Sequence, residues 1–136
     1  ENYAALDAVE TFYKPADESE IKDRIKQFLS AQKITADDID LIITGKNGDH
    51  KNDSVYDDLQ TDVFKTIPTI NYKHLCGEYP TASSFALWLA ANIIKKQKLP
   101  LCFENEFPEL KKFQRILICN NYQSKYYSLM LLSSYN

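Results

Sequence analysis

The sequence is poor in glycine and has no concentration of basic residues. Only 3 glycines occur among 136 residues, which is unusually few for an enzyme built on tight turns. The net charge is −3, and the lysines and arginines are spread along the chain. Nucleic-acid binding needs a concentrated basic face, so we expect no nucleic-acid partner. The longest apolar stretch, Phe85 to Ile94, is shorter than the roughly 20 residues that cross a bilayer, so we expect no membrane partner.

The sequence also lacks paired cysteines. Cys76, Cys102 and Cys119 are odd in number and far apart, and no CxxC pair occurs. Isolated cysteines are typical of reduced thiols, and we therefore expect a cytoplasmic location. The composition, 44% hydrophobic and 26% charged, fits a single globular domain over residues 1–136. Because the chain begins at Glu1 rather than at Met, it could be a piece of a longer protein.

Hydrophobic periodicity and turn residues predict the order β-α-β-α-β-α-β-β. The expected strands cover residues 4–13, 39–44, 66–72, 115–121 and 126–134. The expected helices begin at a capping-box pattern of Asp17 and Glu20, at Asn52 or Asp53, and at Thr81, with a helical turn at 35–38 and an irregular stretch at 99–108. Strands alternating with helices predict an α/β fold: a mixed, mostly parallel sheet of about five strands with helices on both faces. The tight link before the last strand predicts that one strand is antiparallel.

The expected third helix, over residues 81–97, is apolar on all sides. Its apolar side chains leave no polar face; they include Phe85, Leu87, Trp88, Leu89 and Ile93. A helix of that kind must be buried on all sides. A single sheet with helices on its faces would leave one side of this helix in water. The segment therefore predicts another layer of protein over the helix.

The most informative segment is the junction at residues 73–83, KHLCGEYPTAS. It follows a β-branched run, turns at Gly77 and enters the apolar helix through small residues. Such a junction lets backbone and side chains meet a ligand at the mouth of a sheet. It resembles the C-terminal half of the β-ketoacyl synthases, in the thiolase-like fold, where a catalytic lysine precedes a glycine and a catalytic histidine. Lys73 matches the lysine, Gly77 matches the glycine, and Glu78 occupies the histidine position.

Further segments extend this resemblance over residues 34–136. Gly45 falls on the position of the family's first catalytic histidine, and Asp53 follows at the family's spacing. The family's lead-in to its second strand and its closing hairpin correspond to residues 34–40 and 115–134. The resemblance implies that Lys73 and Asp53 are retained from the polar network around the active site. It also implies that the nucleophilic cysteine lies in the other half of the family's fold.

The substitutions at the two histidine positions predict a loss of catalysis. Decarboxylative condensation needs a thiolate that carries the acyl group and donors that hold the developing oxyanion. Gly45 has no side-chain donor, and an ionised Glu78 would repel negative charge. The resemblance therefore implies a degenerate, non-catalytic subunit, similar to a chain-length factor, that pairs with an active β-ketoacyl synthase or with itself. It would act in fatty-acid- or polyketide-type biosynthesis, with an acyl carrier protein as an indirect partner and with no cofactor or metal.

Two other functions stay open. The chain could be a divergent acyl-transfer enzyme that uses Glu78 and Lys73 with a cysteine from a partner half. It could also be a stand-alone interaction domain that has kept only the fold. Glu78 and Lys73 are five residues apart across a turn, and a salt bridge is favoured over an acid–base pair. For Asp53 and Lys73, a structural pair is likewise favoured over proton transfer.

Weaker patterns are interpreted structurally. His74 beside Cys76 could be a base and a nucleophile, but core packing along a strand is favoured. These two residues alternate with Glu78 like metal ligands, yet the spacing matches no strong zinc pattern. A solvated acidic loop is favoured over a cation site for Asp49, His50 and Asp53. Cross-strand pairing is favoured over an acyl tunnel for a set of tyrosines, namely Tyr122, Tyr126, Tyr127 and Tyr135.

Overall fold

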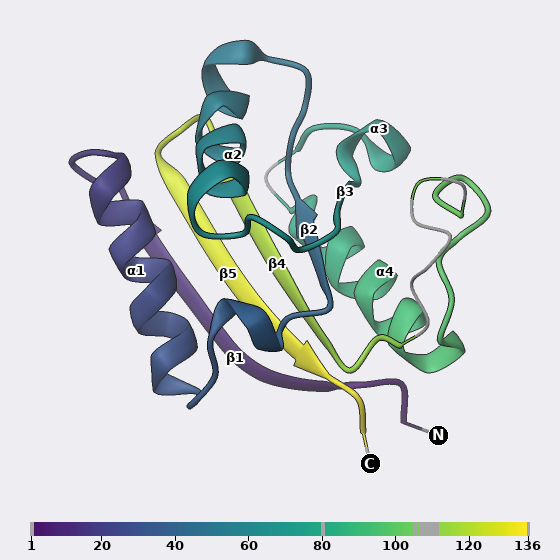
Figure 1. The fold of residues 1–136 in the computed structure, drawn as a ribbon. Helices are drawn as coiled ribbons and strands as arrows, with labels where there is room; N and C mark the ends of the chain where they lie inside the picture. Colours follow the sequence, from purple (N-terminus) through teal and green to yellow (C-terminus); the bar gives the residue numbers. More distant parts are fainter. Residues whose placement is uncertain (1, 80, 105, 107–111, 136) are drawn as a thin grey trace.

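A computed structural model describes residues 2–79, 81–104, 106 and 112–135 (Figure 1). The strands are β1 (Ala5–Tyr13), β2 (Leu41–Thr44), β3 (Thr69–Asn71), β4 (Arg115–Tyr122) and β5 (Tyr126–Ser133). The helices are α1 (Glu18–Ala31), α2 (His50–Asp62), α3 (Lys73–Cys76) and α4 (Ser83–Lys96), with a 3-10 turn, η1, at Ala36–Asp38. The predicted order is confirmed, with α3 as an additional short helix. Pro80 of the junction, and residues 105, 107 and 108 of the expected irregular stretch, lie outside the described residues.

The strands form one mixed sheet in the order β1-β5-β4-β2-β3. β2 pairs in parallel with β3 and β4, whereas β5 pairs antiparallel with β4 and β1. Only β5 runs against the other strands of this sheet, which confirms the predicted sheet with one antiparallel strand. The link between β4 and β5 turns through Gln123 and Ser124 at φ values of 55° and 53°, as a tight hairpin turn of this hand requires.

β3 is shorter than the sequence predicts and lies at the edge of the sheet. Pro68 has no N–H to donate to a ladder, and Ile67 N donates back to Phe64 O at 3.1 Å. The expected strand over 66–72 is therefore reduced to Thr69–Asn71. We also expected Lys73 to lie at the end of a central strand, but β3 is an edge strand and Lys73 begins α3 beyond it.

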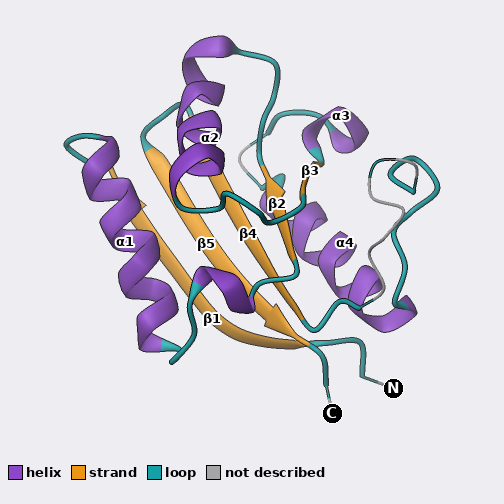
Figure 2. Ribbon diagram, viewed as in Figure 1, coloured by secondary structure: helices purple, strands orange, loops and turns teal. Residues whose placement is uncertain are grey.

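α1 and α2 cover one face of the sheet (Figure 2). The α1 face carries Ile21, Ile25, Phe28 and Leu29, all buried at the predicted spacing. Its cap is Asp17, as predicted, with Oδ1 accepting from the backbone N–H three residues on at 2.9 Å. These side chains pack against Phe12 of β1 and against Tyr127 and Leu129 of β5 in one buried apolar cluster.

α2 begins earlier than predicted. Asp49 caps this helix by accepting from Lys51 N at 3.0 Å, so His50 is already helical. The caps expected at Asn52 or Asp53 are therefore wrong. Asp53 instead lies in the first turn of α2, where its carboxylate is available to the preceding loop.

α4 covers the opposite face with only one of its sides. Ala86, Leu89, Ala90, Ile93 and Ile94 are buried against the sheet. Trp88 is 59% exposed, and Phe85 and Leu87 are partly exposed. A single sheet therefore leaves the other side of this helix uncovered, and the covering layer remains a prediction. No helix among the described segments has the length and apolarity that a bilayer span requires.

The face that α4 covers is also open over β1 and β5. In β5 the even-numbered positions point to this face, because Met130 and Leu132 belong to the α4 cluster. Their antiparallel partners on β1 share the face, so Val9, opposite Met130, lies on this face and is 56% exposed. Tyr13 and Tyr126 form another such pair and are 56% and 54% exposed. The sheet thus has one fully covered face and one half-covered face.

Candidate functional site

Two parallel strands bring the predicted site residues to one end of the sheet. β2 ends just before Gly45, and β3 ends just before Lys73, so both junctions lie at the carboxyl ends of neighbouring strands. A pocket of about 560 Å³ opens there. Its lining includes Asp53, Lys73 and Glu78, together with Lys46, Asn47, Gly48, Asn71, His74 and Gly77. We call it the charged pocket.

Lys73 and Glu78 form an ion pair inside the charged pocket. The Lys73 Nζ lies 2.8 Å from Glu78 Oε2 and 3.0 Å from Oε1, and it donates to the Asn121 carbonyl at 3.1 Å. The Lys73 side chain is 3% exposed and that of Glu78 is 34% exposed. The buried ammonium therefore has its charge compensated within the chain, which confirms the interpretation as a salt bridge.

Asp53 reaches the same network indirectly. Its carboxylate accepts from Asn47 N at 3.1 Å and from Gly48 N at 2.9 Å. The Asn47 side chain in turn donates to Glu78 Oε2 at 2.9 Å. The expected direct pair of Asp53 with Lys73 is therefore wrong, because the ion pair that the structure describes for Lys73 is with Glu78. Asp53 shapes the loop after β2, and that loop orients Glu78.

Gly45 is enclosed by polar side chains. A Cβ atom at this position would lie 2.1 Å from Asn120 Oδ1 and 2.9 Å from the Tyr56 hydroxyl. Asn120 is held there, because its Oδ1 accepts from the Tyr72 hydroxyl at 2.9 Å, while Tyr56 accepts from Asn121 N at 2.8 Å. Burial raises the pKa of both tyrosine hydroxyls, so they stay neutral. The space that a larger side chain would need at Gly45 is already filled.

The other candidate nucleophiles and ligands are not assembled into a centre. His74 is exposed on α3 and meets Phe103 edge-on at 5.9 Å, so the expected strand and core packing of this histidine are wrong. Cys76 is half-buried and donates to the Gly77 carbonyl at 3.5 Å. Burial raises the pKa of the Cys119 thiol to about 12. Within the described segments, no group of three or more His, Cys, Asp or Glu side chains is placed to hold a metal ion.

The tyrosines near the β4–β5 turn are cross-strand neighbours, as predicted. Tyr126 lies 4.9 Å from Tyr13 and 6.5 Å from Tyr122 between ring centroids, and Tyr127 stacks on Phe12 on the opposite face at 5.0 Å. Tyr135 lies apart from them, beside a different pocket.

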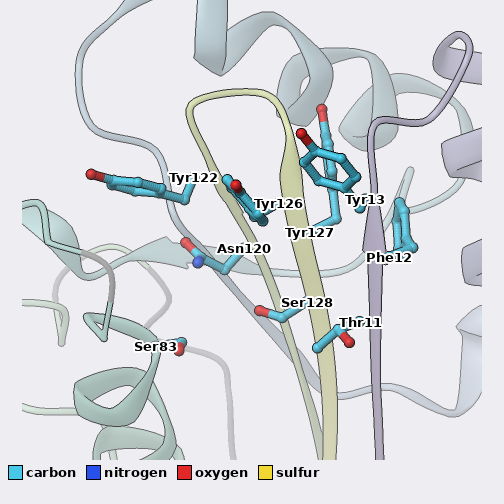
Figure 3. A pocket seen from close by; sticks show the side chains of 9 residues that line it. All are labelled: Thr11, Phe12, Tyr13, Ser83, Asn120, Tyr122, Tyr126, Tyr127 and Ser128. Atoms are coloured by element: carbon cyan, nitrogen blue, oxygen red, sulfur yellow. The ribbon is translucent and has the colours of Figure 1, made fainter.

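These rings border a second cleft of about 430 Å³, which we call the aromatic cleft (Figure 3). Its lining comprises Thr11, Phe12, Tyr13, Ser83, Asn120, Tyr122, Tyr126, Tyr127 and Ser128. The sequence patterns singled out only tyrosines of the hairpin in this lining and did not indicate, among others, Asn120, Ser83 or Ser128. Strand parity could have found two of them, since positions 120, 122, 126 and 128 point to one face of the hairpin.

Comparison with known proteins relates the chain to ketosynthases through its fold. No family model and no curated protein matches it. Among solved structures, the ishigamide ketosynthase/chain length factor superposes on 98% of the chain with a TM-score of 0.77 and 14% identity. A ketosynthase from the type II polyketide synthase complex AntDE:AntF, with its acyl-carrier protein and a bound hexaketide, gives a TM-score of 0.64 at 12% identity over 98% of the chain. The 3-oxoacyl-[acyl-carrier-protein] synthase III from Aquifex aeolicus VF5 gives 0.52 at 12% identity, again over 98%.

The chain spans 38%, 34% and 46% of the lengths of these three proteins. Identities this low carry information about the fold and not about the chemistry. The predicted resemblance to part of a β-ketoacyl synthase is therefore confirmed at the level of the thiolase-like fold.

Proposed function

We propose that this chain is a ketosynthase-like subunit that performs no condensation itself and assembles with an active β-ketoacyl synthase in fatty-acid- or polyketide-type biosynthesis. The observation that carries the proposal is the packing at Gly45. The resemblance puts a catalytic histidine at this position, and Asn120 and Tyr56 occupy the space that such a side chain would need. An oxyanion donor is therefore missing for steric as well as chemical reasons.

Glu78 supports the same proposal. A carboxylate can donate a hydrogen bond to an oxyanion only when it is protonated. Here the Glu78 oxygens act as acceptors, because they receive hydrogen bonds from the Lys73 ammonium and from the Asn47 amide. Neither position that the resemblance assigns to histidine thus offers a donor for a developing negative charge.

The half-covered sheet face supports the partnership. Trp88 and the neighbouring Phe85 ring, 5.4 Å away, expose aromatic surface on α4. Contiguous apolar surface of this kind marks interaction sites on proteins. Two of the similar structures are named as a ketosynthase/chain length factor and as a ketosynthase in complex with an acyl-carrier protein. A cytosolic location is part of the proposal, since the three cysteines are unpaired.

Co-purification with a β-ketoacyl synthase tests the partnership. We expect the wild-type chain to be retained, and we expect Trp88→Glu to weaken retention at least about tenfold, because a central aromatic anchor is replaced by a charge. Gln27→Glu is the matched control, since it places the same charge on an exposed position of α1. Retention of wild type and Trp88→Glu alike, or of neither, would contradict the proposed interface.

Acylation by acyl thioesters tests the absence of catalysis. We expect mass spectrometry to show no stoichiometric acylation of Cys76 or Cys119, alone or with the partner present. Acylation that is lost in Glu78→Gln or Lys73→Ala would favour the divergent acyl-transfer enzyme. An inactive chain that binds no synthase would favour a stand-alone interaction domain.

A further inference from the structure

We propose that the aromatic cleft binds a small, uncharged, planar ring compound that carries a hydrogen-bond-accepting oxygen, such as an aromatic ketone. The cleft lies over the ends of β1, β5 and β4, and this chain alone forms it (Figure 3). The inference is therefore independent of the proposed function. Phe12 and Tyr127 border the cleft from the covered face, and its other strand residues point to the half-covered face. Its volume of about 430 Å³ falls within the range of small-molecule sites.

Three tyrosines give the cleft its aromatic wall. Tyr13, Tyr126 and Tyr122 come from three adjacent strands and point to the same face of the sheet. The ring centroids of Tyr13 and Tyr126 are 4.9 Å apart with an interplanar angle of 35°. Those of Tyr126 and Tyr122 are 6.5 Å apart with an angle of 39°. Tyr13 and Tyr126 remain more than half exposed despite this pairing. Exposed ring faces in a row offer stacking surface to a planar ligand.

Asn120 supplies an unpaired donor on a largely buried side chain. This residue is only 8% exposed, and its Oδ1 is occupied by the Tyr72 hydroxyl and packs close to Gly45. Its Nδ2 has no hydrogen-bond partner among the residues that the structure describes, and the side chain borders the cleft. An amide nitrogen can only donate. A ligand that satisfies it must therefore present an accepting oxygen or nitrogen, and the anchoring of Oδ1 fixes the direction of that bond.

The rest of the lining sets the charge and the polarity of the ligand. All nine lining residues are uncharged, in contrast to the charged pocket, so the lining itself offers no ionised group to an ionic ligand. The Lys14 ammonium is not part of the lining and lies over the Tyr13 ring, 5.3 Å from its centroid. The hydroxyls of Ser83, Ser128 and Thr11 also make no hydrogen bond within the described part of the chain, and they can accept or donate at the margin of the ring. A neutral ring with one or two oxygen substituents fits this set.

Titration of the protein with three fused-ring probes tests the proposal. We expect 1-tetralone, an aromatic ketone, to bind saturably with one site per chain in calorimetry. We expect tetralin, which has the same rings without the oxygen, and 1-naphthoate, which carries a charge, to bind at least about tenfold more weakly. A binding site that aims a fixed donor at its ligand discriminates against the analogue that lacks the acceptor.

Two variants and one spectroscopic signal locate the site. Tyr126→Ala removes the central ring and should weaken the binding of 1-tetralone at least about tenfold, because one stacking partner is lost. Tyr135→Ala is the matched control, because this tyrosine is 61% exposed but lies beside another pocket, and it should leave the affinity unchanged. In NMR spectra the Asn120 side-chain amide protons should shift on binding. Absence of saturable 1-tetralone binding, equal affinity for tetralin, an equal effect of both variants, or unshifted Asn120 amide signals would overturn the proposal.

Discussion

The charged pocket and the aromatic cleft are linked through two adjacent residues of β4 and differ in how their polar groups are satisfied. Asn120 lines the aromatic cleft, and the Asn121 carbonyl accepts from Lys73 of the charged pocket. In the charged pocket, Lys73 donates to Glu78 and to the Asn121 carbonyl, and Asp53 accepts from two backbone N–H groups. In the aromatic cleft, the Asn120 Nδ2 and three hydroxyls have no partner among the described residues.

This difference separates a site that stabilises the fold from one that can take a ligand. A ligand that enters the charged pocket must compete with an existing ion pair, and breaking such a pair leaves a buried charge uncompensated. A ligand in the aromatic cleft instead gains hydrogen bonds that the chain leaves unmade. Lys73 thus has a structural use, whereas the cleft beside Gly45 has polar groups that the described residues leave unpaired.

The largest effect is expected where the two regions meet. Gly45→His should lower the free energy of unfolding by about 3 kcal/mol, because the new side chain overlaps Asn120 and Tyr56. Chemical denaturation measures the loss. The same substitution in an Asn120→Ala background should cost less than in wild type, since the nearest obstructing atom is gone. Additive losses in this double-mutant cycle would show that Asn120 does not fill the site.

Within the charged pocket, Lys73→Ala should lower the free energy of unfolding by about 1–3 kcal/mol, because Glu78 and the Asn121 carbonyl lose their donor. Lys46→Ala is the control: this lysine pairs with Asp57, whose side chain is 65% exposed, and such surface pairs contribute about 0–1 kcal/mol. Equal losses for the two lysines would mean that the burial of Lys73 carries no energetic weight.

The sequence predicted the sheet and its helices better than it predicted the contacts of the site. The helical spacing of Ile21, Ile25 and Phe28 predicts α1, because this prediction depends only on residues that are close in the sequence. The partner of Lys73 depends on where the loops after β2 and β3 meet. Asp49 caps α2, so the Asp53 carboxylate is available to accept from the Asn47 backbone N–H. This contact sets the position of the loop after β2.

The aromatic cleft was hidden in the sequence for a related reason. Its lining comes from three strands and from the first residue of α4, Ser83, so no local pattern contains it. Tyr13 and Tyr126 are 113 positions apart by their numbering and become neighbours only through the β1–β5 pairing. Parity within the hairpin indicates which residues share a face, but the register between β1 and β5 has to be known first.

The buried thiol of Cys119 in β4 should make the free energy of unfolding depend on pH in the alkaline range. Burial raises the pKa of Cys119 from an ordinary 9.0 to about 12, so the folded state holds this proton more tightly than the unfolded state. The contribution is complete below about pH 9 and is lost as pH rises toward 12, with a slope of about 1.4 kcal/mol per pH unit in between. Denaturation of wild type and Cys119→Ala across this range should give curves that converge as pH rises. Parallel curves would contradict the assignment to Cys119, since Tyr56 and Tyr72 titrate in both proteins.

The smallest effect on stability is expected in the aromatic cleft itself. Tyr126→Ala removes the cross-strand contacts with Tyr13 and Tyr122, and each such pair contributes about 0.2–1 kcal/mol. Ser128→Ala should change the free energy of unfolding even less, because its hydroxyl makes no hydrogen bond within the described residues. Thermal and chemical denaturation of both variants, beside Lys73→Ala, measure the contrast. Losses in the cleft as large as the loss at Lys73 would mean that its open polar groups stabilise the fold, and the distinction between the two regions would fail.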